Sequence, residues 1–356
     1  MKSKKSLLTA LQIAITLGIL WFIFRDPAKR AEMFATLRQA DAWWLLAGLL
    51  IYGVVEICAG VRWKLLLAVQ GVALSWTRTF ALLLIGVFFN FFIPGGTGGD
   101  VVKIYFLLKE TPGRRTAALL SVLVDRVIGL FALIVLAGAI IAARWSWLTA
   151  TPDTASAVWT TLAILGVSFS GIMFSLHITS FGLVHRLPVR FPWRDKIAEL
   201  ALAYSLYGRA WRASLGAFAL SIVAHLGYFA TFYCAAAALR GSGARIPTLD
   251  ELCSIMPIVN TITAMPISLG GVGIREGLFQ LFLGQLSGVA PAVAVVISST
   301  GYLLTMFWGL VGGAIYLAYR PSEHARLREI REKVAATEHE IAEEERALEI
   351  AQEEKK

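Results

Sequence analysis

The feature that most constrains this chain is a series of apolar runs, each about as long as a bilayer is thick. A helix of about 20 apolar residues spans the ~30 Å hydrocarbon core of a bilayer. The chain is 57% hydrophobic and only 16% charged, which is unlike soluble domains. We therefore predict an all-α integral membrane protein, a polytopic helix bundle. The predicted crossings are Leu7–Phe24, Trp43–Val61, Thr116–Ala143, Val158–Ile178, Ala213–Leu239 and Ala290–Tyr319.

The segment Phe88–Lys103 breaks this pattern, because an apolar run ends near Asn90 and Pro94 and is followed by GGTGG and Asp100. Irregular backbone at membrane depth is tolerated only where protein or a water-filled cavity surrounds it. Basic residues flank the segment on both sides, and the positive-inside rule places such residues in the cytoplasm. We predict a re-entrant hairpin that enters from the cytoplasmic side and lines a site.

A second broken segment has the same pattern, with Asn260 upstream of Pro266 and the pair Gly270 and Gly271 following. Three predicted crossings separate the two segments, so the second hairpin should enter from the opposite face. Paired interruptions in two inverted halves point to the substrate site of a transporter. Coincidence is the alternative, because proline and glycine are frequent in membrane helices.

The charge distribution orients the chain in the cytoplasmic membrane. Basic residues concentrate between Arg186 and Arg212, where Asp195–Trp211 has the spacing of an interfacial amphipathic helix. We predict both termini in the cytoplasm. Residues 1–320 would form one membrane domain of about six to eight helices plus the two re-entrant segments. Residues 321–356 would form a charged helical tail, and homo-oligomerisation is an open alternative.

Asp125 and Arg126 are the clearest charged residues inside a predicted crossing. A charge at mid-bilayer costs ~2.5–3.5 kcal/mol on insertion scales, so it needs a partner. Adjacent helical residues point about 100° apart, so these two should face different partners. Asp125 shares a face with Ser121 and Gly129, which suits close helix packing. The pair either locks two helices together or contacts a substrate.

The amides that follow the first break can form an anion cradle. Consecutive N–H groups of Gly98 and Gly99 at a helix start would suit a lipid phosphate, with Lys103 adding charge. Asp100 would repel a phosphate, so we assign it to bracing a basic residue, with an ordinary helix N-cap as the alternative. Arg275 and Glu276 repeat the acid and base association after the second break, and guanidinium binds phosphate in a bidentate manner.

Cofactor and nucleic-acid chemistry find no support in the residue pattern. Cys58, Cys234 and Cys253 have no C-x-x-C spacing, and no histidine pair has metal-ligand spacing. Basic runs are not interleaved with stacking aromatics outside the predicted crossings. We expect no metal, cofactor or nucleic-acid partner, and assign no catalytic residue.

Four stretches, RWKLLLAVQGV, FFNFFIPGGTGGDVVKIYFL, AALLSVLVDRVIGLFAL and PISLGGVGIREGLF, carry a family resemblance. In this order they resemble the lysylphosphatidylglycerol synthase transmembrane-region family of flippase-like proteins, from about Leu7 to Tyr319. No sequence after Tyr319 resembles the aminoacyltransferase domain of bifunctional members, so we expect no lysyl-lipid synthesis. The matching motifs carry over Asn90, Gly98, Gly99, Asp100, Asp125, Arg126, Gly270, Gly271, Arg275 and Glu276.

Together these patterns lead us to expect a lipid translocase. It would bind a membrane lipid with an anionic or phosphate headgroup, either a phospholipid or a polyprenyl-phosphate-linked lipid, between the two broken segments. One alternative is an intramembrane transferase with Asp100 or Asp125 as the base. Another is a non-transporting partner in an envelope complex that acts through its charged tail.

Overall fold

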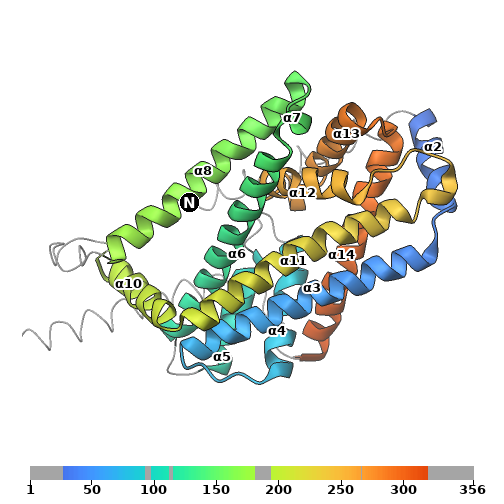
Figure 1. The fold of residues 1–356 in the computed structure, drawn as a ribbon. Coiled ribbons are helices and arrows are strands. Elements are labelled where there is room, and N and C mark those ends of the chain that lie inside the picture. Colours follow the sequence, from blue (N-terminus) through green and yellow to red (C-terminus); the bar gives the residue numbers. More distant parts are fainter. Residues whose placement is uncertain (1–26, 93–97, 112–114, 181–193, 266, 320–356) are drawn as a thin grey trace, which may run out of the picture.

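The computed structural model describes residues 27–92, 98–111, 115–180, 194–265 and 267–319, and the regular structure within these ranges is entirely helical (Figure 1). This agrees with the predicted all-α class. The α-helices are α2 (Pro27–Arg38), α3 (Ala42–Val69), α4 (Trp76–Phe92), α5 (Gly98–Glu110), α6 (Arg115–Ala143), α7 (Trp145–Leu148), α8 (Pro152–Ser180), α10 (Arg194–Arg209), α11 (Trp211–Ala237), α12 (Leu249–Thr263), α13 (Ile274–Ser287) and α14 (Pro291–Tyr319). Two short 3-10 helices are η1 (Arg240–Ser242) and η2 (Leu269–Gly271).

Five described helices, α3, α6, α8, α11 and α14, are long and apolar enough to cross a membrane. They correspond to five predicted crossings, while the sixth, Leu7–Phe24, lies outside the described residues. One predicted boundary is wrong, because α3 continues past Val61 to Val69. The sequence after Arg62 stays apolar and buries Trp63 and Leu66. Arg62 is therefore a helix residue and not part of a cytoplasmic loop.

The long helices approach one another closely where they carry glycine. Helices α3 and α11 pack side by side (Figure 1), and Gly48 of α3 leaves room for Cys234 of α11. Helix α14 packs against α4, where any Cβ on Gly312 would collide with the carbonyl oxygen of Leu84. Small residues allow membrane helices to approach in this way, because lipid offers no hydrophobic driving force between helices.

Both broken segments form pairs of short helices. Helices α4 and α5 pack together as the first hairpin, and α12 and α13 pack together as the second. The two hairpins lie toward opposite ends of the bundle (Figure 1). The turn prolines, Pro94 and Pro266, lie outside the described residues. The opposed placement is compatible with an inverted repeat, although the internal symmetry itself stays a prediction.

Each hairpin is enclosed by its own apolar core. Trp63, Phe106 and Tyr316 belong to the cluster around the first hairpin. Phe279 and Phe282 belong to the cluster around the second. Helix α14 spans both clusters, since its N-terminal half joins the second and its C-terminal half joins the first. The fold therefore holds two hairpins in separate cores along one shared helix.

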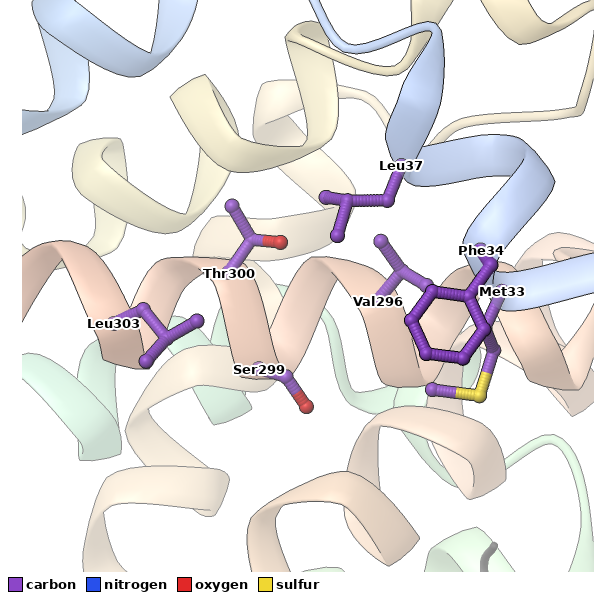
Figure 2. Close-up of a pocket in the computed structure, with 7 residues that line it drawn as sticks. All are labelled: Met33, Phe34, Leu37, Val296, Ser299, Thr300 and Leu303. Carbon is purple, nitrogen blue, oxygen red and sulfur yellow. The ribbon is translucent and has the colours of Figure 1, made fainter. Parts of the chain in front are cut away.

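Helix α2, which the sequence analysis did not predict, lies against α14. Its apolar side chains Met33, Phe34 and Leu37 border a pocket of ≈ 180 Å³ whose other wall is α14, including Val296 and Leu303 (Figure 2). Met33 is buried, whereas Phe34 is exposed at the rim. This contact fixes the residues before α3 against the core of the second hairpin.

Candidate functional site

Five charged side chains gather where α3, α5 and α6 meet at the first hairpin: Arg62, Asp100, Lys103, Asp125 and Arg126. Helix α3 supplies one, α5 supplies two and α6 supplies two. Three cations and two carboxylates leave one positive charge in excess when these five are counted alone. The cluster is therefore a network of ion pairs in which most of the charge is compensated, and not a single ion pair.

Asp125 is the centre of this network. Arg62 Nε donates to Asp125 Oδ1 at 2.7 Å and Arg62 Nη2 donates to Oδ2 at 3.1 Å, a bidentate pair. The third nitrogen, Nη1, donates to Ser221 Oγ of α11 at 3.0 Å. Asp125 is 4% exposed, so the pair is taken out of solvent and depends on this hydrogen bonding. The Arg62–Asp125 pair thus joins α3, α6 and α11.

Sequence reasoning missed Arg62, because the predicted crossing Trp43–Val61 ends immediately before it and the positive-inside rule assigns the basic residues that follow to a cytoplasmic loop. Two signals could have identified it. The apolar run continues beyond it, and it begins the RWK stretch that helped to carry the family resemblance. A basic residue inside a crossing needs a carboxylate at the same depth, and Asp125 was the available candidate.

Lys103 packs between the carboxylate of Asp125 and an aromatic ring. Its Nζ lies 3.7 Å from Asp125 Oδ2 and 3.7 Å from the ring centroid of Trp63. Trp63 is fully buried and Lys103 is 4% exposed. A cation over the face of tryptophan is attracted by the ring quadrupole, most strongly when desolvated. Lys103 is therefore held inside the network and is not presented to a ligand.

Asp100 and Arg126 form the accessible end of the cluster. Arg126 Nη2 donates to Asp100 Oδ1 at 2.6 Å, and no further hydrogen-bond partner of this guanidinium occurs in the described part of the chain. The Arg126 side chain is 54% exposed, against 14% for Asp100. Asp125 and Arg126 face different partners, and Asp100 braces a basic residue, as the sequence analysis expected.

The glycines of the first hairpin act in helix packing. Gly99 N donates to Asn90 Oδ1 at 2.9 Å, so this amide already has a partner. A Cβ on Gly99 would collide with the carbonyl oxygen of Gly86 on α4. Gly99 is therefore needed for the close crossing of α4 and α5. Contrary to the predicted anion cradle, its amide is not open to an anion. Gly98 is buried beside it in the first turn of α5.

The small-residue face of α6 makes room for polar groups. A Cβ on Gly129 would lie 3.4 Å from Arg62 Nη1, and the carbonyl oxygen of Gly129 is 3.1 Å from His225 Nε2 of α11. Ser121 Oγ donates back to the carbonyl oxygen of Ala118. The predicted small-residue seam therefore accommodates two polar groups, the Arg62 guanidinium and the His225 ring, and does not serve for close packing of helix backbones alone.

The second hairpin turns through glycines in the left-handed region. Their φ values are positive, at 57° for Gly270, 73° for Gly271 and 86° for Gly273, and residues other than glycine rarely adopt such values. Arg275 Nη2 donates to the carbonyl oxygen of Gly270 at 2.7 Å. The guanidinium carbon lies 4.0 Å from the ring centroid of Tyr302. The turn therefore wraps around one arginine.

One guanidinium nitrogen of Arg275 is not used in any hydrogen bond within the described residues. Arg275 is 4% exposed, and within the described residues its Nη1 atom has no hydrogen-bond partner. The described residues contain no ion pair between Arg275 and the neighbouring Glu276, whose Oε2 accepts from Gly273 N at 2.6 Å and whose Oε1 accepts from Ser298 Oγ at 3.1 Å. Glu276 thereby caps the start of α13 through its own carboxylate, because Gly273 at the N-cap position has no side chain to complete a capping box. Its place is structural.

Asn260 does not repeat the role of Asn90. Its backbone carbonyl accepts from Ala264 N at 3.0 Å at the end of α12. Among the described residues its side chain makes no hydrogen bond like the one between Asn90 and Gly99. The matching positions of the two asparagines in sequence therefore do not give matching contacts.

The two hairpins approach each other through aromatic rings. Phe91, near the end of α4, lies 5.4 Å from Tyr302 between ring centroids. Tyr302 in turn covers Arg275 of the second hairpin. The described residues contain no ion pair between the charged cluster of the first hairpin and Arg275. The expected site residues thus form two groups, joined by Phe91 and Tyr302.

Comparison with known proteins agrees with this architecture. The family model described as lysylphosphatidylglycerol synthase TM region matches residues 9–313. A UPF0104 membrane protein of Methanothermobacter thermautotrophicus is 22% identical over 342 residues, covering 87% of this chain and 92% of that protein. A UPF0104 membrane protein of Pyrococcus horikoshii is 27% identical over 134 residues, covering 37% of this chain and 38% of that protein.

The family match spans both hairpins, the Asp125 and Arg126 pair and the glycine turn before Arg275. It ends within α14 at Gly313, one of the glycines that allow α14 to approach α4 of the first hairpin. On this evidence the chain is a multi-pass membrane protein that belongs to the lysylphosphatidylglycerol synthase TM-region family.

Proposed function

We propose that the protein translocates a lipid with a phosphate-bearing headgroup across the cytoplasmic membrane, and that Arg126 is the first headgroup contact. The observation that carries this proposal is the exposed guanidinium of Arg126 inside a candidate membrane span, braced by Asp100 at 2.6 Å. A charge in the membrane is costly, so an exposed one marks a pathway or site. Membership of a lipid-related family supports the same substrate class.

The bracing of Arg126 suits a phosphate better than a cation. One nitrogen of its guanidinium binds Asp100, and the side chain is 54% exposed, so its other donors are available to a phosphate, which can accept two parallel hydrogen bonds. Asp100 offsets the positive charge while the site is empty. Asp125 and Lys103 are buried and paired, so we assign them to holding α3, α5 and α6 together.

Arg275 supplies the second contact in this proposal. Among the described residues its buried Nη1 atom has no hydrogen-bond partner, and no carboxylate forms an ion pair with it. The path between the two arginines runs past Phe91 and Tyr302. A phosphate that moves from Arg126 to Arg275 would pass from a charge-compensated cluster to a cation that has no carboxylate partner among the described residues. The hydrocarbon tails of the lipid would stay in the bilayer.

The orientation follows from the charges at the helix ends. Arg78 and Lys109 lie at the base of the first hairpin, and Arg209 and Arg212 lie at the corner between α10 and α11. The positive-inside rule puts this side in the cytoplasm. The second hairpin then enters from the outer face, so each arginine serves one leaflet.

A flipping assay tests the proposal. The full chain is reconstituted in phosphatidylcholine vesicles that contain fluorescent phosphatidylglycerol, and dithionite quenching reports which leaflet holds the probe. Arg126→Ala should slow flipping roughly 10- to 100-fold, because charge-assisted hydrogen bonds contribute about 1.5–3 kcal/mol. Arg126→Lys should recover part of the rate, since lysine keeps the charge without the bidentate fork.

The exposed Arg38 of α2 provides the matched control, since Arg38→Ala removes a guanidinium far from both hairpins in sequence. Its flipping rate should equal that of the unmodified chain. Unchanged flipping in both Arg126→Ala and Arg275→Ala would overturn the proposed headgroup path. A transferase has no comparable support, because Asp100 and Asp125 both already bind arginine.

A further inference from the structure

A second cavity lies away from the hairpins, between α6, α8, α10 and α11, with a volume of ≈ 350 Å³. Its lining is almost entirely apolar. The α6 wall extends from Val124 to Phe131, a rise of roughly 10 Å. Ile172 and Met173 of α8 form the opposite wall, and Phe218 of α11 packs against Phe131 with ring centroids 5.7 Å apart. We call this cavity the α8–α10 groove.

The few polar groups that line the groove already have partners. Tyr207 Oη donates to the carbonyl oxygen of Leu66 at 3.1 Å, and Ser214 Oγ donates to the carbonyl oxygen of Tyr207 at 2.8 Å. Tyr204 Oη lies 3.1 Å from Ser175 Oγ. A polar ligand would therefore gain little in the groove. A hydrocarbon chain makes no such demand.

The end of the groove at the α10–α11 corner is basic. Gly208 and Ser214 line the groove, and Arg209, Trp211 and Arg212 lie between them in sequence and are exposed. The Arg212 guanidinium stacks over Trp211 at 5.5 Å. Neither arginine has a carboxylate partner within the described ranges. Exposed tryptophan with arginine is typical of the level of lipid headgroups.

We propose that the α8–α10 groove binds one acyl chain of an anionic glycerophospholipid, whose phosphate contacts Arg209 and Arg212. Two independent features support this occupant, namely an apolar groove lined largely by candidate membrane-spanning helices and, at its end, two arginines without a carboxylate partner among the described residues. Acyl chains are the surrounding medium at this depth, and guanidinium groups bind phosphate.

This site is distinct from the proposed translocation path. On α6 the groove residues Val124, Ile128 and Phe131 share one face, whereas Arg126 points to the other side of the helix. The bound lipid would stay in place while another lipid moves along the hairpins. The groove proposal therefore does not rest on the flipping activity.

Photo-cross-linking of the full chain in nanodiscs tests the site. The probe is phosphatidylglycerol with a diazirine in one acyl chain, and mass spectrometry maps the labelled peptides. We expect labelling of residues 172–176, 204–208 and 214–218. A phosphatidylcholine probe with the same chain should label these peptides at least about fivefold less. Equal labelling by the two probes would overturn the anionic headgroup assignment.

Gly208 allows the groove to be filled without strain. A Cβ at Gly208 meets no atom within 4 Å, so Gly208→Phe would place a ring in the groove. Gly166 of α8 is exposed, is equally open at its Cβ and does not line the groove, so Gly166→Phe is the matched control. We expect Gly208→Phe to abolish labelling of these peptides and Gly166→Phe to leave it unchanged.

The arginines are tested together as R209Q/R212Q, which should lower labelling by phosphatidylglycerol to the level of phosphatidylcholine. Labelling that persists in Gly208→Phe would overturn the groove assignment, as would a cross-link showing that residues 181–193 of the chain itself fill the groove. Arg126→Ala should not change the labelling. A loss of flipping with intact groove labelling would thus separate this site from the proposed function.

Discussion

The two hairpins have similar frames but differently built tips. Arginine closes the base of each one: Arg78 Nη1 donates to Glu110 at 3.1 Å in the first, and Arg245 Nη2 donates to Glu251 at 2.8 Å in the second. The hairpins differ at their tips, by which we mean Gly98–Lys103 with its ion-pair partners in the first hairpin and Gly270–Glu276 in the second. The first tip is an ion network with a glycine inside a helix, whereas the second is a left-handed glycine turn around Arg275 alone.

The two tips differ in charge compensation and in exposure: the first is compensated and partly exposed, whereas the second is buried and has no ion pair among the described residues. The first tip holds carboxylates against each cation and leaves Arg126 half exposed. The second tip buries Arg275 with a carbonyl oxygen and an aromatic ring in place of a carboxylate. A buried charge without a counter-ion is destabilising, so it is retained where another benefit offsets the cost. A phosphate that completes the second tip would be such a benefit.

The largest expected effect concerns the compensated tip. Asp125→Leu leaves the buried Lys103 and the partly buried Arg62 without their carboxylate, and breaking a buried pair costs about 3–5 kcal/mol. We expect a loss of that size in the free energy of unfolding, measured by circular dichroism in mixed detergent micelles. The double variant R62L/D125L should lose less than D125L, because it leaves fewer unpaired charges.

The exposed pair of Arg144 and Asp250 is the control, with a separation of 2.8 Å that resembles the buried pair. Asp250 is 66% exposed, so Asp250→Leu should cost no more than about 1 kcal/mol. Equal losses in D125L and D250L would show that the network does not hold the first hairpin.

The next effect distinguishes the glycines of the two tips. Gly271→Ala forces a left-handed φ of 73° on alanine and brings its Cβ to 2.7 Å from Thr263 Cβ. The backbone strain alone should cost about 1–2 kcal/mol of unfolding free energy. Thr263→Gly should relieve only the contact, so the double variant G271A/T263G should stay less stable than T263G by the strain term.

Gly277 of α13 lies in the same hairpin and is the control. Nothing lies within 4 Å of its Cβ position, so Gly277→Ala should be neutral or stabilising by up to about 1 kcal/mol. In the first hairpin, Gly99→Ala should be destabilising for a different reason, since its Cβ would force α4 and α5 apart. A stable G271A variant would contradict the strained turn.

Sequence reasoning could predict the frame because glycine, proline and charge in an apolar run are local signals. It located both hairpins, and the divergence of Asp125 from Arg126 follows from helix geometry alone. It could not predict that Asn90 occupies the Gly99 amide, because that bond depends on how two helices cross. Arg62 was missed for a related reason, since only Asp125, which is distant in sequence, explains a partly buried arginine inside a long helix.

A smaller effect tests the ring that covers Arg275. Tyr302→Leu removes the aromatic face 4.0 Å from the guanidinium, and a desolvated cation–π contact is worth about 2 kcal/mol. The unfolding free energy should fall by roughly 1–2 kcal/mol, and flipping of fluorescent phosphatidylglycerol should slow. Tyr302→Phe keeps the ring and should lose less in both measurements. Equal losses in the two variants would assign the effect to the hydroxyl.

The smallest expected effects lie at the bases of the hairpins, where the ion pairs are partly exposed. Glu110 binds Arg78 and also accepts from the Tyr319 hydroxyl, so Glu110→Gln removes charge from a three-residue contact. Glu251 binds Arg245 but also closes the capping box with Thr248, and glutamine can keep that cap. Both variants should cost less than about 1 kcal/mol.

The two bases should nevertheless respond differently in hydrogen exchange. In Glu110→Gln we expect faster amide exchange at the end of α5, because that base joins α4, α5 and α14 through one carboxylate. In Glu251→Gln the start of α12 should stay protected, because the cap persists and Arg245 still donates to the carbonyl oxygen of Ser287 at 3.0 Å. Glu251→Ala removes the cap as well and should therefore speed amide exchange at the start of α12. Equal amide exchange in E110Q and E251Q would contradict the expected difference between the two bases.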